Sequence, residues 1–257
     1  MIEPSQVNPR ECLWQAIDTE VKSLEGSIQA LWRRRNALAP VLSLPTEIIK
    51  TIFSLLHVPG TPPPSTLDGK PDHLSWLCVA HVCHQWREIA LNQPLFWSHV
   101  DFNAVSSASA AEIFTRAKMV PLHLEAKISF VHWDNAWFSA FQKELKDHIS
   151  HIHHLDISAE HLQLNETLNR LTSPAPTLEY LSLLCQDIVI DMQKSLPDTP
   201  FSNSTPRLFF LKLTHCAIGW ESPLLRGVKH LHISSTFERP SLLVWLDALD
   251  EMPISRH

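Results

Sequence analysis

Residues 79–90, VAHVCHQWREIA, contain side chains that could ligate a metal or move protons: two histidines, a cysteine and a glutamate. Cysteine and histidine are the usual zinc ligands, and histidine is the commonest acid–base catalyst. On a helix, however, Cys83 points about 160 degrees away from His81, so this stretch alone does not converge on one ion. The apolar face of such a helix holds Cys83 with Val79, Val82, Trp86, Ile89 and Ala90. We therefore predict packing or docking here, and no metal.

A second histidine group comprises His148, His151, His153 and His154. The first two fall at the end of a predicted helix, where a cation suits the negative end of the dipole, so we expect capping and surface roles for them. The chain has no G-x-S-x-G, no phosphate-binding glycine loop and no H-E-x-x-H motif. We predict no catalytic residue, no metal and no cofactor. A hydrolase or metal protein of an unmarked kind is the weaker alternative.

The composition is that of a globular protein inside the cell. Of 257 residues, 44% are hydrophobic and 19% are charged, and the net charge of -6 gives no attraction to nucleic acid or to anionic membranes. The first residues lack the pattern of a secretory signal, and no apolar run approaches the roughly 20 residues that span a bilayer. Five cysteines without a C-x-x-C pair argue against a disulfide framework. We expect a cytoplasmic or nuclear protein that binds neither nucleic acid nor membrane.

A heptad stripe marks the N-terminal region. Apolar residues recur at alternating steps of three and four, with Arg35 in the one polar place, at Trp14, Ile17, Val21, Leu24, Ile28, Leu31 and Leu38. This spacing predicts a coiled-coil-like helix that ends near Pro40. Two interpretations stay open: the helix pairs with a second chain in a homodimer, or it folds back onto its own domain.

The next segment, residues 43–56, predicts a helix that is apolar on two sides. Its apolar residues cover a wider arc than the stripe of about 100 degrees typical of a helix buried on one side. Residues 57–73 are rich in proline and predict an exposed loop, after which residues 74–92 resume helical spacing.

The remaining chain is organised by a repeat of the form apolar-x-x-apolar-x-apolar. It recurs at Trp97/Val100/Phe102, Met119/Leu122/Leu124, Ile152/Leu155/Ile157, Leu178/Leu181/Leu183, Leu208/Leu211/Leu213 and Val228/Leu231/Ile233. The spacing straddles that of leucine-rich repeats, and LFFLKLTHCAI fits their longer form. We predict a parallel-strand solenoid; an ordinary α/β domain with short buried strands is the alternative.

The second segment resembles the F-box. The pattern of that family is met at Leu44, Pro45, Glu47, Ile48, Ile52, Phe53, Leu56, Val82, Cys83, Trp86, Arg87, Ile89, Ala90, Pro94 and Trp97. The whole layout is similar to the F-box-like proteins expanded in mushroom-forming fungi. The predicted fold class is α+β, with an N-terminal coiled-coil-like helix (1–40), an all-α F-box (41–97) and a short, irregular leucine-rich-repeat α/β solenoid with a parallel sheet (98–257).

What the resemblance implies is an adaptor of an SCF-type cullin-RING ubiquitin ligase. The F-box would dock on the Skp-type linker subunit, and the repeats would bind a protein substrate that the sequence does not name. By position, the linker-facing residues are Leu44, Pro45, Ile48 and Ile52, with some of Val82, Cys83 and Trp86. Alternation along the strands points a second set out of the sheet for substrate binding: His154, Asp156, Tyr180, Ser182, Phe210, Lys212, His230 and His232. An F-box-fold scaffold that engages no ligase is the alternative.

Overall fold

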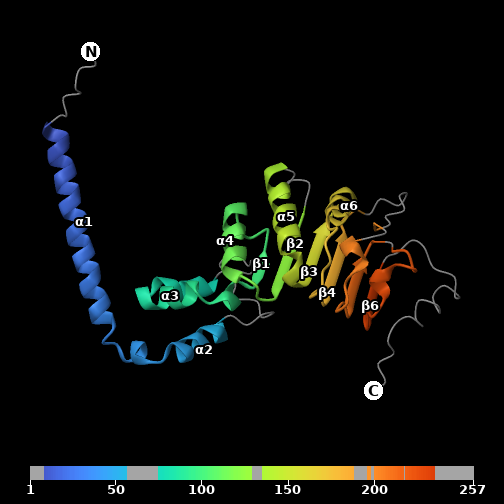
Figure 1. Ribbon diagram of the computed structural model, residues 1–257, viewed down its shortest axis with the longest axis horizontal. Coiled ribbons are helices and arrows are strands. Elements are labelled where there is room, and N and C mark those ends of the chain that lie inside the picture. The colour runs from blue at the N-terminus through green and yellow to red at the C-terminus, as the bar shows by residue number, and fades with distance from the viewer. Residues whose placement is uncertain are drawn as a thin grey trace, which may run out of the picture. The chain divides into compact units, whose positions relative to one another are not determined.

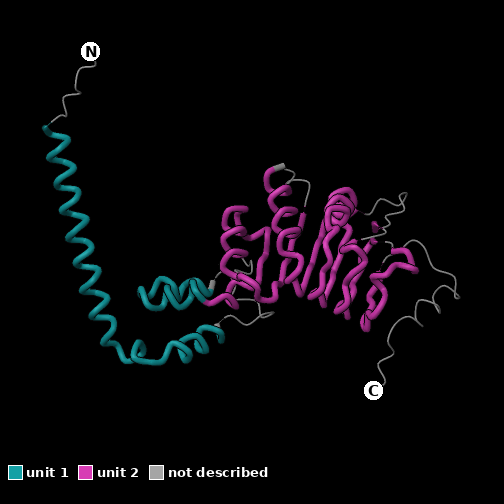
Figure 2. Tube along the Cα trace, in the orientation of Figure 1, with its two compact units in different colours: residues 1–58, 76–92 teal, residues 59–75, 93–257 magenta. Residues whose placement is uncertain are grey.

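The computed structural model describes residues 9–56, 75–128, 135–187, 196–197, 200–216 and 218–234. The chain divides into two compact units, residues 1–58 with 76–92 and residues 59–75 with 93–257 (Figure 2). A long N-terminal helix, a helical region and an α/β region with a parallel sheet follow one another, which confirms the predicted fold class (Figure 1). The proline-rich loop and the last predicted repeat helix lie outside the described residues. None of the described helices has the length and apolar character needed to span a bilayer.

The first unit begins with helix α1, Pro9–Asn36. Glu11 lies in its first turn and three arginines lie in its last, so each charge suits the nearby end of the helix dipole. No residue of α1 is buried, and the heptad side chains from Trp14 to Leu31 are 46% to 68% exposed. The predicted helix and its apolar stripe are therefore present, and the stripe side chains are exposed in the part of the chain that the structure describes.

The rest of the first unit is helical, with a break that the sequence did not predict. It contains η1 (Pro40–Ser43), α2 (Thr46–Leu56), η2 (Ser75–His81, apart from its first residue) and α3 (His84–Leu91). A continuous helix over residues 74–92 is wrong, because the backbone of Cys83 is extended, with φ -157° and ψ 170°. The Cys83 thiol caps α3 by accepting a hydrogen bond from the amide of Trp86 at 3.5 Å. A new helix start leaves amides that need such a partner.

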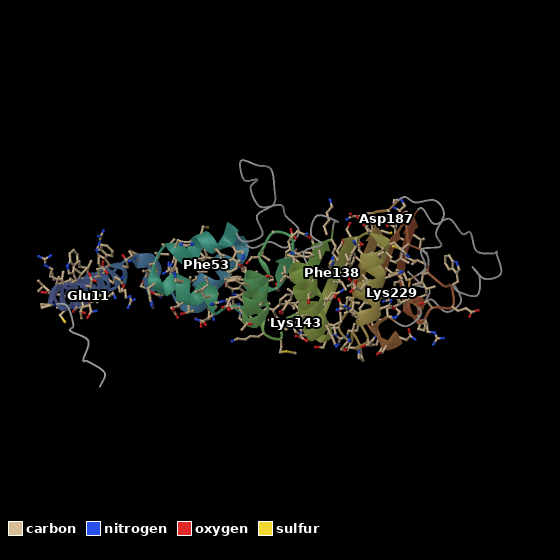
Figure 3. All side chains as sticks on the ribbon, turned by 90° about the horizontal axis from the view of Figure 1, so that it is seen from above. Glu11, Phe53, Phe138, Lys143, Asp187 and Lys229 are labelled. Carbon is tan, nitrogen blue, oxygen red and sulfur yellow. The ribbon has the colours of Figure 1, made fainter. Side chains whose placement is uncertain are left out.

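Helices α2 and α3 share one small core. Ile49 and Phe53 of α2 are buried, and the ring of Phe53 meets that of Trp86 edge to face with centroids 5.0 Å apart. Figure 3 labels Phe53 among these helices. Arg87 donates from Nε to the carbonyl oxygen of Ala80 at 2.9 Å, which ties α3 to η2.

The second unit is built on a six-stranded sheet in which neighbours in the chain are neighbours in space, all parallel. Its strands are β1 (His99–Asp101), β2 (Leu122–Lys127), β3 (Ile152–Ala159), β4 (Tyr180–Cys185), β5 (Phe210–Thr214) and β6 (His230–Ser234). The connections include η3 (Pro94–Trp97) before β1, α4 (Ser107–Ala117), α5 (Asn135–His148), η5 (Ile149–His151), α6 (His161–Arg170), η6 (Pro200–Asn203) and η7 (Pro223–Leu225). Helices α4, α5 and α6 lie along the same side of the sheet (Figure 1).

One row of apolar residues runs across the sheet in register: Val100, Leu124, Leu155, Leu181, Leu211 and Leu231. All six predicted strands are present, but the second repeat was aligned two residues too early. Leu124, and not Leu122, pairs with Val100, and Met119 is 74% exposed. The cause is local, because α4 ends at Ala117 and Lys118 turns the chain with φ 56°, which leaves Met119 in the turn.

His151 is buried in η5, so the surface role expected for it is wrong. Among the described residues, neither of its ring nitrogens has a hydrogen-bond partner. Burial, helped by nearby His148, lowers the pKa of His151 below its ordinary 6.5. The folded state therefore holds this imidazole neutral, whereas the unfolded chain protonates it below about pH 6.5.

We expect His151 to make folding pH-dependent. Its neutral form is compatible with the fold above pH 6.5, and stability is lost as the pH falls from 6.5 towards the lowered folded pKa. Urea unfolding at pH 7.5 and 5.5 should show a smaller acid loss for His151→Leu than for the unchanged chain. His230→Gln, at an exposed site, is the control and should keep the full loss. Equal acid losses in both variants would contradict the assignment.

Candidate functional site

Helix α2 carries apolar side chains on two faces. The inward face is buried through Ile49 and Phe53. A second face exposes Ile48, Ile52 and Leu55 along the helix and Leu44 just before it, with exposed fractions from 36% to 70%. We call these four residues the outer face of α2. Exposed apolar side chains that line up in this way mark interaction sites more often than chance exposure does.

The other residues predicted to face a linker divide between the surface and the interior. Pro45 is exposed beside Leu44, and Val82 is 60% exposed in the turn before α3. Trp86 packs on Phe53, and Cys83 caps α3, so both have roles within the chain. Leu55 was not predicted to face the linker. Its position three residues after Ile52 could have identified it, because residues three apart lie on the same face of a helix.

The second candidate surface is the face of the sheet opposite its buried apolar row. Six rings cross it in strand order: His99, His123, His154, Tyr180, Phe210 and His230. We call them the ring ladder. Centroids of successive rings lie 4.3, 3.7, 3.8, 4.4 and 6.2 Å apart, and the three central contacts are stacked. Residues that are paired across neighbouring strands point to the same face of the sheet. An aromatic ring at the same paired position of each strand therefore gives a continuous aromatic strip.

Charge changes sign along the ladder. A hollow of about 630 Å³ over β1 to β3 is lined by three acidic residues, Asp101, Glu125 and Asp156, and by one basic residue, Lys127. A second hollow of about 470 Å³ over β4 to β6 is lined by Lys212, Lys229 and rings of the ladder; Lys229 is labelled in Figure 3. An acidic end and a basic end therefore flank one aromatic strip.

Burial sets the protonation of groups along this strip. It lowers the pKa of His154 to about 4, so this imidazole is neutral at neutral pH. Burial also raises the pKa of Asp156 and of Tyr180, the latter with help from the charge of Asp156. The centre of the strip is thus an uncharged stacking surface.

All eight residues predicted to bind a substrate lie on the strands at positions that alternate with the apolar row. Ser182 is buried, at 4% exposed, whereas the other seven are partly or fully exposed. The sequence prediction missed the matching residues of the first two strands: His99, Asp101, His123 and Glu125. The same alternation rule applied to β1 and β2 finds them once the second repeat is aligned on Leu124.

Comparison with known families agrees with this organisation. Residues 41–103 match the family model described as F-box-like. The match begins at the second residue of η1 and takes in α2, η2, α3, η3 and β1, and the parallel sheet continues after it. No curated protein and no solved structure matches the chain. The resemblance to the F-box is thereby confirmed for this segment.

Two neighbouring residues of α2 test the separation between its faces. Phe53→Ala should cost about 3–5 kcal/mol of unfolding free energy, because it removes a buried ring and its contact with Trp86. Leu55→Ala should change stability by no more than about 0.5 kcal/mol, because the side chain is 70% exposed. Urea unfolding followed by tryptophan fluorescence measures both, and similar losses would show that the outer face is part of the core.

Proposed function

We propose that the chain is a non-enzymatic substrate-recognition adaptor of an SCF-type cullin-RING ubiquitin ligase, acting in the cytoplasm or nucleus. The outer face of α2 binds the Skp-type linker subunit, and the open face of a leucine-rich-repeat-like sheet binds a protein substrate. The observation that carries the proposal is the exposed apolar face of α2 inside the segment that matches the F-box-like family.

The outer face supplies binding energy of the right kind. Full burial of one Leu or Ile side chain contributes roughly 1.5–3 kcal/mol relative to full exposure. Four such side chains, each between 36% and 70% exposed, leave several kcal/mol to gain from a partner. Pro45, next to Leu44 in the chain, and Val82, in the turn before α3, are further exposed apolar residues of this region.

The open face of the sheet supports binding of an extended protein segment. Its aromatic centre suits apolar or aromatic side chains, and its two ends favour opposite charges. We expect a substrate segment with basic residues over β1 to β3, near Asp101 and Asp156, and acidic residues over β5 to β6, near Lys212 and Lys229.

The linker-binding proposal is tested by a charge placed on either side of one helix. Ile52→Glu puts a carboxylate on the outer face of α2 and should weaken co-purification with the Skp-type linker by at least about 30-fold, because a docked carboxylate is desolvated without a partner. Ser54→Glu adds the same charge at an exposed polar position of α2 and should bind normally.

Circular dichroism should show the same helix content in both variants. Normal linker binding by Ile52→Glu would contradict the proposed face. If the unchanged chain fails to bind the linker, the F-box-fold scaffold becomes the better account.

We also propose that α1 pairs with the α1 helix of a second copy, in antiparallel orientation. The stripe from Trp14 to Leu31 has the spacing 3-4-3-4-3, so it matches itself about a twofold axis between Val21 and Leu24. Its side chains are about half exposed, and a second stripe of the same kind buries them.

The charges of α1 favour the antiparallel arrangement. Its first two thirds carry Glu11, Asp18, Glu20 and Glu25 against two basic residues, whereas its last turn carries three arginines. A parallel pair places the three arginines of one last turn beside those of the other. In the antiparallel pair about this axis, residue i faces residue 45 − i, so the two arginine groups lie at opposite ends and Arg34 faces the partner's Glu11.

Sedimentation of the full chain should give a dimer. Val21→Glu combined with Leu24→Glu should give a monomer with unchanged helix content, while Thr19→Glu combined with Ser23→Glu on the polar face should stay dimeric. In the Cys78→Ser background, spin labels on the exposed Cys12 should be about 30 Å apart along the axis, from a rise of 1.5 Å per residue. A monomeric full chain, or labels side by side, would contradict this pairing.

A further inference from the structure

Two imidazoles and one carboxylate converge at the β1–β2 end of the ring ladder. His99 Nε2 lies 3.8 Å from Glu125 Oε1, and His123 Nε2 lies 3.0 Å from the same oxygen. The three donor atoms all lie within 4.8 Å of one another. Among the residues that the structure describes, His99, His123 and Glu125 form the group of three metal-ligating side chains that lie this close together.

The sheet register produces the convergence. His99 and His123 are paired residues on adjacent parallel strands, so their side chains leave the same face, and their ring centroids are 4.3 Å apart. Glu125 follows His123 by two residues and therefore points to the same face. The buried partners Val100 and Leu124 fix the two strands in this register.

We propose that His99, His123 and Glu125 form a binding site for a divalent transition-metal ion of the zinc type. Zinc lies about 2.0–2.2 Å from imidazole nitrogen and carboxylate oxygen, which places two tetrahedral ligand atoms about 3.4 Å apart. The separations of 3.8 and 3.0 Å from Glu125 to the two histidines lie on either side of that value. A small rotation of the side chains closes the set around one ion.

The surroundings suit such an ion. The side chain of His99 is 11% exposed and that of His123 is 30% exposed, while Glu125 at 41% leaves the outer side open. A fourth position there can be filled by water or by a side chain of a bound partner. The far face of His123 stacks on His154 at 3.7 Å, which holds its ring in place before an ion arrives.

Two nitrogens and one oxygen fit zinc better than the hard cations. Calcium and magnesium select sets made of oxygen atoms, whereas imidazole suits zinc, copper and nickel. An ion at this place links β1 to β2 and adds positive charge to the acidic end of the open face. The site goes beyond the proposed adaptor function and does not depend on it.

Zinc itself is the probe for the test. Calorimetric titration of the full chain, freed of metal beforehand, should give one zinc per chain at pH 7.5 with a dissociation constant of about 10 µM or below. Glu125→Gln keeps the shape of the side chain and removes the charged ligand, so it should weaken binding at least about tenfold, as should His123→Ala. Zinc should raise the thermal midpoint of the unchanged chain and of neither variant.

His153→Ala is the matched control. His153 Nδ1 lies 3.5 Å from Glu179 Oε2, which makes a histidine–glutamate pair of similar exposure outside the three-ligand group. This variant should bind zinc as the unchanged chain does. Absence of stoichiometric zinc binding, or unchanged affinity in both Glu125→Gln and His123→Ala, would overturn the proposal. If His123→Ala does not fold, the Glu125→Gln result decides.

Discussion

The parallel register of six short strands is the constraint on which the second unit depends. One apolar row, from Val100 to Leu231 and buried as far as Leu211, fixes each strand against the next, and the alternation of strand side chains then decides every position on the opposite face. The stacked rings, the change of charge along them and the meeting of His99 with His123 all follow from that one alignment. The apolar row therefore determines which residues lie on the open face, although its own side chains point to the other side of the sheet.

Helix α2 also has one face that packs in a core and one face that is exposed. Ile49 and Phe53 use one face to build a core with Trp86, and this fixes the helix with its other apolar face turned to solvent. An apolar helix face left exposed is unfavourable for an isolated chain, and a partner that covers it gains the corresponding burial energy. This face lies inside the segment that matches the F-box-like family.

The sequence predicted those features that depend on local periodicity. The heptad spacing gives α1, the wide apolar arc gives the two faces of α2, and the repeated apolar triplet gives all six strands. It failed where a single backbone conformation intervenes, as at Lys118, which moves Met119 out of the second strand, and at Cys83, which breaks a predicted helix. The group of His99, His123 and Glu125 was missed because it exists only once β1 and β2 are paired, and no local spacing encodes that pairing.

The central claim is that one chain holds the ligase linker on α2 and keeps the face of its sheet free for another protein. Hydrogen exchange of the full chain with and without the Skp-type linker tests this directly. The account predicts slower exchange of residues 44–56 and 82–91 in the presence of the linker, with unchanged exchange in β4 to β6. Protection confined to the sheet, or none in α2, would contradict it.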